Sequence, residues 1–255
     1  MNTKRSLNTK LLVLSINTFI LTVSLAGCAG AGTKDPRAAD YNSELGIRYL
    51  QQGRLKLANE KLLKSLEQNP NSAQSNHYYA LLQERLNQPK KAITYFEKAV
   101  RIAPKDPELR NNYGSFLCKN KRPQAAVKQF LTAIKDPLYS TPEFAYTNAG
   151  ICLRKVNPAN PQAEKYFRLA LKKKSSFPSA LLEMSKIYKD RQNYPKAQAF
   201  MLRYEKVGKS SPDALKLCTI INEKMNNHAK ASSCRSALLR LFPSSPEAEK
   251  MGENL

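Results

Sequence analysis

The sequence predicts an all-α fold, a solenoid of about six repeated helical pairs. The main observation is an alanine that recurs with a period of about 34 residues and follows a small residue by 12 positions. The clearest pairs are Gly46 with Ala58, Ala80 with Ala92, Gly114 with Ala126, and Ser185 with Ala197. The pair Gly150 and Ala163 is stretched by one position, and Thr219 with Ala231 forms a degenerate sixth unit.

Each unit also shows the apolar spacing of a helix packed on a second helix. Apolar residues follow the recurring alanine by four and seven positions, as in Ala92-Phe96-Ala99, Ala126-Phe130-Ala133 and Ala163-Phe167-Ala170. A proline lies in the first turn of the expected second helix, where its missing N–H costs nothing: Pro89, Pro123, Pro161 and Pro195. Small residues that face each other let the two helices of a pair approach closely.

This pattern resembles the tetratricopeptide repeat, although the tryptophan common in that repeat is absent. The resemblance implies a right-handed superhelical solenoid over residues 39–246, with an extended groove lined by the first helix of each pair. We expect the repeats near 39–72, 73–106, 107–140, 143–177, 178–211 and 212–245, followed by a C-terminal tail at 247–255.

The N-terminus has the order of an export signal. Basic residues precede an apolar run from Leu11 to Leu25, and the segment Leu25-Ala26-Gly27-Cys28 follows. That segment resembles the lipobox of bacterial lipoproteins, which implies a signal peptide at 1–27 and acylation of Cys28. The alternatives are an ordinary signal peptide that ends in cysteine and a transmembrane anchor, which the polar residues within the run disfavour.

The residue after the cysteine bears on the destination of such a lipoprotein. An aspartate there favours retention in the inner membrane in the families that the segment resembles, and here the residue is Ala29. We therefore expect a lipid-anchored protein on the periplasmic side of the outer membrane. Residues 28–38 are small and polar, which favours a flexible leash between the lipid and the solenoid.

The chain is strongly basic, with 42 lysine and arginine residues against 20 acidic ones. Without residues 1–27 the net charge is +19. Such a charge favours anionic partners, such as anionic lipid, peptidoglycan, an acidic protein or nucleic acid. Export disfavours nucleic acid. Because the basic residues are spread along the helical segments, the simpler interpretation is a solvated basic surface.

Four cysteines remain besides Cys28, and four cysteines allow three connectivities. The repeat register places Cys118 and Cys152 in the first helices of adjacent units, and Cys218 and Cys234 on the two helices of repeat six. We therefore expect the disulfides Cys118–Cys152 and Cys218–Cys234. The alternative is four free, buried thiols.

The register also predicts a partner-binding groove in the first two repeats. Its expected residues are Ile47, Leu50, His77, Leu81 and Glu84. Apolar side chains at such positions favour a hydrophobic channel, unless Ile47 and Leu50 pack against the leash or the next helix. In repeats three and four the expected groove residues are polar: Asn111, Ser115, Lys119, Thr147, Arg154 and Lys155.

The sequence contains neither a recognisable catalytic motif nor a phosphate-binding glycine loop. It has only two histidines, His77 and His228. We expect no catalytic residue, no metal and no cofactor, and therefore not an enzyme.

Four segments give a closer resemblance that covers nearly the whole chain. They are residues 44–53 and 136–142, the run Asn-Asn-Tyr-Gly-Ser-Phe-Leu-Cys at 111–118, and Asn-Ala-Gly-Ile-Cys at 148–152. They resemble the PilF or PilW family of type IV pilus biogenesis lipoproteins, some members of which bridge the cysteines matched by Cys118 and Cys152.

This resemblance implies a pilotin, a protein that binds secretin subunits, brings them to the outer membrane and stabilises their multimer. Another periplasmic role remains open, in which an adaptor with the same groove recruits envelope or cell-wall enzymes.

Overall fold

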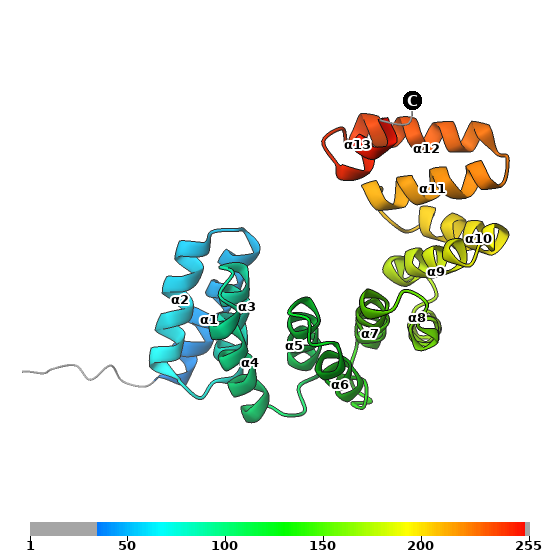
Figure 1. Cartoon of the computed structure of the whole chain (residues 1–255). Helices are drawn as coiled ribbons and strands as arrows, with labels where there is room; N and C mark the ends of the chain where they lie inside the picture. Colours follow the sequence, from blue (N-terminus) through cyan, green and yellow to red (C-terminus); the bar gives the residue numbers. More distant parts are fainter. Residues whose placement is uncertain (1–34, 253–255) are drawn as a thin grey trace, which may run out of the picture. The chain divides into compact units, whose positions relative to one another are not determined.

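The computed structural model describes residues 35–252, and this part of the chain contains helices and no strands. The described residues form thirteen helices, which Figure 1 labels in chain order. Their bounds are α1 Pro36–Gln51, α2 Leu55–Gln68, α3 Ala73–Arg85, α4 Pro89–Ile102, α5 Pro107–Lys119, α6 Pro123–Ala133, α7 Pro142–Val156, α8 Pro161–Lys173, α9 Pro178–Asp190, α10 Tyr194–Glu205, α11 Pro212–Lys224, α12 His228–Leu241 and α13 Pro246–Gly252. The prediction of an all-α fold of six repeated helical pairs is confirmed.

The first twelve helices form six consecutive antiparallel pairs. Each helix packs most extensively on its partner in the pair, from α1 with α2 to α11 with α12. The first helix of a pair also contacts the first helix of a neighbouring pair, as α1 does α3 and α5 does α7. The first helices therefore form one layer. The second helices lie on the other side of it, and each contacts the first helix of the next pair, as α2 does α3 and α6 does α7.

Within a pair, a small residue on the first helix faces a large residue on the second. A Cβ atom on Gly114 of α5 would lie 2.7 Å from the Phe130 ring of α6. Phe130 is almost fully buried, as are the equivalent Phe96 and Phe167. The sequence predicts that Gly114 faces the small residue Ala126, but the side chain nearest to it is Phe130, four residues later. This contact between a small and a large residue sets how closely the two helices approach.

The turn inside a pair has a recurring backbone geometry. Five of the six turns contain one residue with a left-handed φ between 55° and 73°, and these residues are Gly53, Asn87, Lys121, Gln192 and Asn226. This conformation ends a helix and reverses the chain. The turn of the fourth pair, residues 157–160, is one residue longer and lacks this conformation. The stretched spacing in repeat four is located in this turn.

The structure differs from the expected boundaries at both ends of the solenoid. α1 begins at Pro36, inside the segment expected to be leash, because the Asp35 side chain accepts a hydrogen bond from Arg37 N and Pro36 occupies the first helical position. Most of the expected tail forms α13, which packs on α11 and α12 and buries Ala248. The stack therefore ends in a short covering helix.

The predicted signal peptide and Cys28 lie outside the described residues. Between residues 35 and 252, no helix combines the length and the apolar character that crossing a membrane requires.

Candidate functional site

A cavity of about 440 Å³ lies on the layer of first helices, across the first three pairs. It is lined by Ile47, Leu50, Gln51, Leu81, Glu84, Arg85 and Lys119. The structure therefore brings together four of the five predicted groove residues on α1 and α3. The three apolar side chains are partly exposed, although many large apolar residues in the solenoid are fully buried. We call this cavity, defined by its seven lining residues, the apolar cavity.

The rim of the apolar cavity is charged on one side. Lys119 Nζ of α5 lies 3.2 Å from Glu84 Oε1 of α3, and the Lys119 side chain is largely exposed. An ion pair in such an exposed position contributes little to folding stability. Arg85 is exposed beside it and takes part in no ion pair among the described residues. Arg85 is therefore available to contact an acidic or carbonyl group of a partner, and Lys119 can exchange its exposed ion pair with Glu84 for such a contact.

His77 does not line the cavity, contrary to the prediction. Only 7% of its surface is exposed, and its Nε2 atom lies 3.1 Å from Asn112 Nδ2 on α5. Burial lowers the pKa of His77 to about 4, against a small opposing effect of the Asp106 charge. The ring is therefore neutral near pH 7, and Nε2 accepts the hydrogen bond from Asn112. His77 joins the second and third repeats and does not contact a partner.

Thr147, a predicted groove residue of repeat four, is buried. It is 2% exposed, and its hydroxyl lacks a hydrogen-bond partner within the described residues. The neighbouring Asn148 instead reaches repeat three, where its Nδ2 donates to Asn111 Oδ1 at 3.0 Å and to Ser115 Oγ at 3.3 Å. Asn148 precedes Gly150 by two residues, as Asn112 precedes Gly114, so the contact repeats that of Asn112 with His77 one unit earlier.

Arg154 is also a structural residue and not a free groove residue. Its guanidinium lies 2.5 Å from Glu183 Oε2 and 2.7 Å from Asp190 Oδ2, both on α9. The Arg154 side chain is only 13% exposed. The pairing connects the fourth and fifth repeats, and Lys155 beside it remains exposed.

The structure joins the cysteines in the two pairs expected from the repeat register. Cys118 of α5 and Cys152 of α7 connect adjacent repeats, with 5.7 Å between their Cα atoms. Cys218 of α11 and Cys234 of α12 connect the two helices of repeat six, with Cα atoms 6.1 Å apart. Both separations suit a disulfide.

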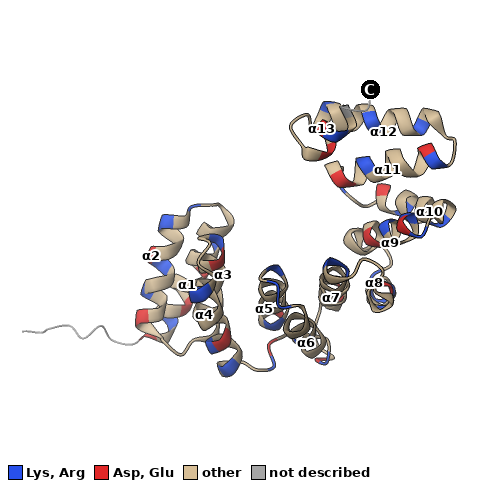
Figure 2. Cartoon of the chain, viewed as in Figure 1, with Lys and Arg blue, Asp and Glu red and all other residues tan. Residues whose placement is uncertain are grey.

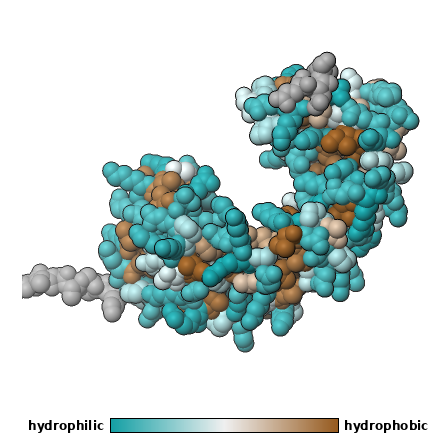
Figure 3. All heavy atoms as spheres, in the orientation of Figure 1, coloured by the Kyte–Doolittle hydropathy of each residue, from teal (hydrophilic) through white to brown (hydrophobic). Residues whose placement is uncertain are grey.

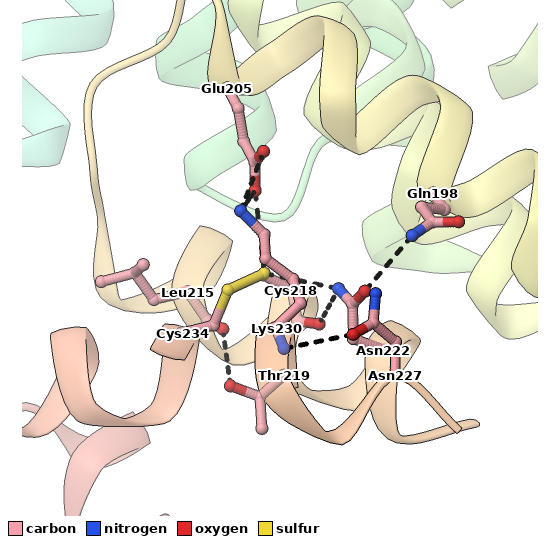
Figure 4. Close-up of a disulfide and its surroundings, with 9 residues drawn as sticks. All are labelled: Gln198, Glu205, Leu215, Cys218, Thr219, Asn222, Asn227, Lys230 and Cys234. Carbon is pink, nitrogen blue, oxygen red and sulfur yellow. Dashed lines mark hydrogen bonds and ion pairs between the residues drawn. A yellow bond between two sulfur atoms is a disulfide. The ribbon is translucent and has the colours of Figure 1, made fainter. Parts of the chain in front are cut away.

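Figure 4 shows the polar surroundings of the Cys218–Cys234 bond. The Glu205 carboxylate forms an ion pair with Lys230 at 3.1 Å, and Asn222 Nδ2 donates to the carbonyl oxygen of Cys218 at 2.8 Å. Glu205 and the two sulfur atoms lie within 4.8 Å of one another. As a disulfide the two sulfurs are not thiolates, so this group is not a metal site in the described state.

Figure 2 marks the basic and acidic residues on the helices, and their numbers differ between the first and the second helices of the pairs. The first helices of the six pairs contain eleven basic and nine acidic residues, whereas the second helices contain seventeen basic and five acidic residues. The layer that carries the apolar cavity is therefore almost neutral. Figure 3 shows hydrophobic patches that interrupt a mainly hydrophilic surface. The repeat register assigns each basic residue to a first or a second helix, so this division could have been predicted from the sequence.

Comparisons with known proteins agree with this architecture. Two family profiles described as tetratricopeptide repeat match residues 43–107 and 95–128. The chain is 31% identical over 242 residues to the type IV pilus assembly protein PilF of Pseudomonas aeruginosa, and the alignment covers 91% of this chain and 95% of the relative.

Two solved structures are similar over most of the chain. A structure of Pseudomonas aeruginosa PilF has a TM-score of 0.76 at 29% identity and covers 86% of this chain and 98% of that one. The structure of PilW, described as a widely conserved type IV pilus biogenesis factor, has a TM-score of 0.75 at 27% identity and covers 85% and 99%.

Proposed function

The chain belongs to the PilF/PilW family of tetratricopeptide proteins of type IV pilus biogenesis, and from this premise we propose that it is a non-enzymatic pilotin. In this proposal Cys28 is acylated and holds the protein in the outer membrane. The apolar cavity binds a secretin subunit, and the tether concentrates bound subunits at the bilayer, where they assemble into the multimer.

The apolar cavity is the observation that carries the proposal. It combines three partly exposed apolar side chains with a charged rim, on a layer of almost neutral helices. An apolar segment of a partner gains free energy by burial against Ile47, Leu50 and Leu81. The rim charges of Arg85 and Lys119 then fix its orientation. Apolar side chains beside charged ones suit the binding of a protein segment, which supports a binding role.

The anchor would make the attachment durable. A single acyl chain binds a membrane only marginally, whereas two or more chains give stable anchoring. A lipobox cysteine carries several chains on one residue, so the protein would stay at the membrane while partners exchange at the cavity.

A double substitution in the cavity tests the binding role. Leu50→Glu with Leu81→Glu places two charges where an apolar segment would be buried, and we expect at least a tenfold loss of secretin recovered with the purified protein from envelope extracts. The matched control is Leu63→Glu with Leu202→Glu, which changes two exposed leucines on the second helices α2 and α10. Equal recovery of secretin by both double variants would contradict the proposed site.

A second test addresses the anchor. Cys28→Ala removes the acylation residue, and we expect a folded protein that no longer fractionates with the outer membrane and fails to place secretin there. Normal amounts of secretin multimer in the outer membrane of this mutant would refute the tethering mechanism.

Deletion of the gene distinguishes the pilotin from the alternative role, a general periplasmic adaptor. Loss of surface pili and of secretin multimers supports the pilotin, whereas altered cell length or lysis with intact pili supports the adaptor.

A further inference from the structure

The turn between α6 and α7, residues 134–141, presents the most exposed large apolar side chain of the described residues. Leu138 is 88% exposed, against 65% for Tyr41, the next in order. The turn is ordered around it, because Leu138 N donates to Asp136 Oδ1 at 2.8 Å and Tyr139 N donates to the Asp136 carbonyl at 3.2 Å. Tyr139 is buried beside it. The backbone of the turn therefore fixes the Leu138 side chain in a solvent-exposed position, where burial against a partner would be favourable.

Two lysines flank this leucine. A hollow of about 390 Å³ beside the turn is lined by Pro104, Lys105, Thr132, Lys135, Asp136 and Pro137. Lys105 and Lys135 are exposed, and neither forms an ion pair within residues 35–252. Asp136 accepts a hydrogen bond from Leu138 N, and Asp106 accepts one from Leu109 N at 3.0 Å, and both carboxylates remain charged beside the lysines. The result is an apolar tip next to two exposed lysines that form no ion pair.

This turn lies at the edge where the first helices begin. Because the pairs are antiparallel and neighbouring first helices pack together, the connections between pairs share one edge of the solenoid. Four of these connections, residues 103–106, 134–141, 174–177 and 206–211, contain five basic and two acidic residues. They are Lys105, Lys135, Lys174, Lys206 and Lys209 against Asp106 and Asp136. We call the side of the solenoid formed by these connections the inter-unit edge.

The chain enters the solenoid at the same edge. The start of α1 is fixed to the end of α2, since Ser65 Oγ donates to the Ala39 carbonyl at 2.7 Å and Asn42 Nδ2 donates to Gln68 Oε1 at 2.9 Å. From Cys28 to Asp35 the chain advances seven residues, which span about 25 Å at most when fully extended. An acyl group on Cys28 would therefore hold the inter-unit edge close to a bilayer.

We propose that the inter-unit edge lies on the headgroup region of a bilayer that contains anionic phospholipid, with Leu138 inserted and Lys105 and Lys135 on the headgroups. This inference rests on the proposed acylation of Cys28. A bilayer suits both features, because the leucine requires an apolar phase and the lysines require phosphate or another anion. A polysaccharide would satisfy only part of this chemistry.

The arrangement also orients the apolar cavity. Leu50 and Glu84 lie in the last turns of α1 and α3, and Lys119 is the last residue of α5. A first helix of 13 residues is about 20 Å long. The cavity is therefore at the far end of these helices from the inter-unit edge, so an edge on the membrane leaves the cavity open to the periplasm.

A tryptophan reporter tests this inference directly, because the chain contains no tryptophan. The acylated Leu138→Trp protein is bound to vesicles of phosphatidylglycerol and phosphatidylcholine or of phosphatidylcholine alone. We expect a blue shift of the emission with the anionic vesicles and quenching by brominated acyl chains. Adding Lys105→Glu and Lys135→Glu to the reporter protein should abolish both effects.

The matched control is Val156→Trp. Val156 is 61% exposed at the last residue of α7, so it lies at the opposite edge from Leu138, and its reporter should stay unquenched. The inference is overturned if Leu138→Trp protein floats with vesicles but its emission matches that of the Val156→Trp control. It is also overturned if the emission responds to purified peptidoglycan or a secretin fragment and not to lipid. Protein that floats with vesicles of neither composition contradicts acylation itself, and the inference with it.

Discussion

Lowering the pH from 7.5 to 5 should reduce the free energy of unfolding by about 2 kcal/mol through His77 alone. The pKa of His77 is about 4 in the folded chain, against an ordinary value of 6.5. The unfolded state therefore binds more protons between these two values, and stability falls as the pH drops through this window. The loss is complete near pH 4, where it amounts to about 3 kcal/mol. Above pH 6.5 the neutral ring fits its site and the contribution is fully present.

The assay is urea unfolding followed by circular dichroism at several pH values between 5 and 7.5, where most carboxylates stay ionised. His77→Gln keeps an acceptor for Asn112 and has no proton to gain, so its stability should depend much less on pH. The matched control is His228→Gln, since His228 is exposed and is the other histidine of the chain. If His77→Gln and His228→Gln lose stability equally between pH 7.5 and 5, the assignment of a buried neutral histidine is wrong.

Three further predictions concern the stability of the solenoid. Cys118→Ser with Cys152→Ser removes a disulfide between cysteines 34 residues apart, and urea unfolding should show that the free energy of unfolding falls by about 3–4 kcal/mol. If reductant leaves the unfolding midpoint of the unmodified protein unchanged, the bond does not form. Phe130→Ala empties the space opposite Gly114, and calorimetry should report a loss of about 3–5 kcal/mol, so a loss below 1 kcal/mol would contradict the tight packing of this pair. Lys121→Gly relieves a left-handed φ of 59° and should raise stability by about 1 kcal/mol in urea unfolding, and a destabilised variant would refute the assigned backbone conformation.

The repeat architecture was predictable because its signal is periodic and physically constrained. The small residue Gly114, the alanine Ala126 twelve positions later and the large Phe130 four positions after that fix the register of repeat three without any structure. The same register correctly placed Ile47 and Leu81 on one surface, because residues at equal positions of successive first helices face the same way.

The register failed where local chemistry outweighed the repeat. In repeat four Thr147 is buried, and the neighbouring Asn148 instead contacts Asn111 of repeat three. The repeat register assigns His77 to a groove position. In the structure His77 is instead buried between the second and third repeats, where it accepts a hydrogen bond from Asn112 of the next repeat. The repeat spacing assigns each residue to a position in its unit. It does not show which side chains form buried hydrogen bonds with a neighbouring repeat.

The helix ends carried a signal that the repeat pattern obscured. Asp35-Pro36 and Ser245-Pro246 have the same cap-and-proline form as Asp106-Pro107, which marks the start of α5. The predicted bounds followed the repeat period and not these local signals. They therefore start the solenoid at residue 39 instead of 36, and they assign most of α13 to a tail.

The proposed contact between the apolar cavity and secretin can be tested most directly by crosslinking in cells. A photo-crosslinking amino acid at Leu81, inside the cavity, should give a covalent product that contains secretin. The same amino acid at Leu202, an exposed leucine of α10, should give none. Secretin crosslinked from position 202 and not from position 81 would contradict the account.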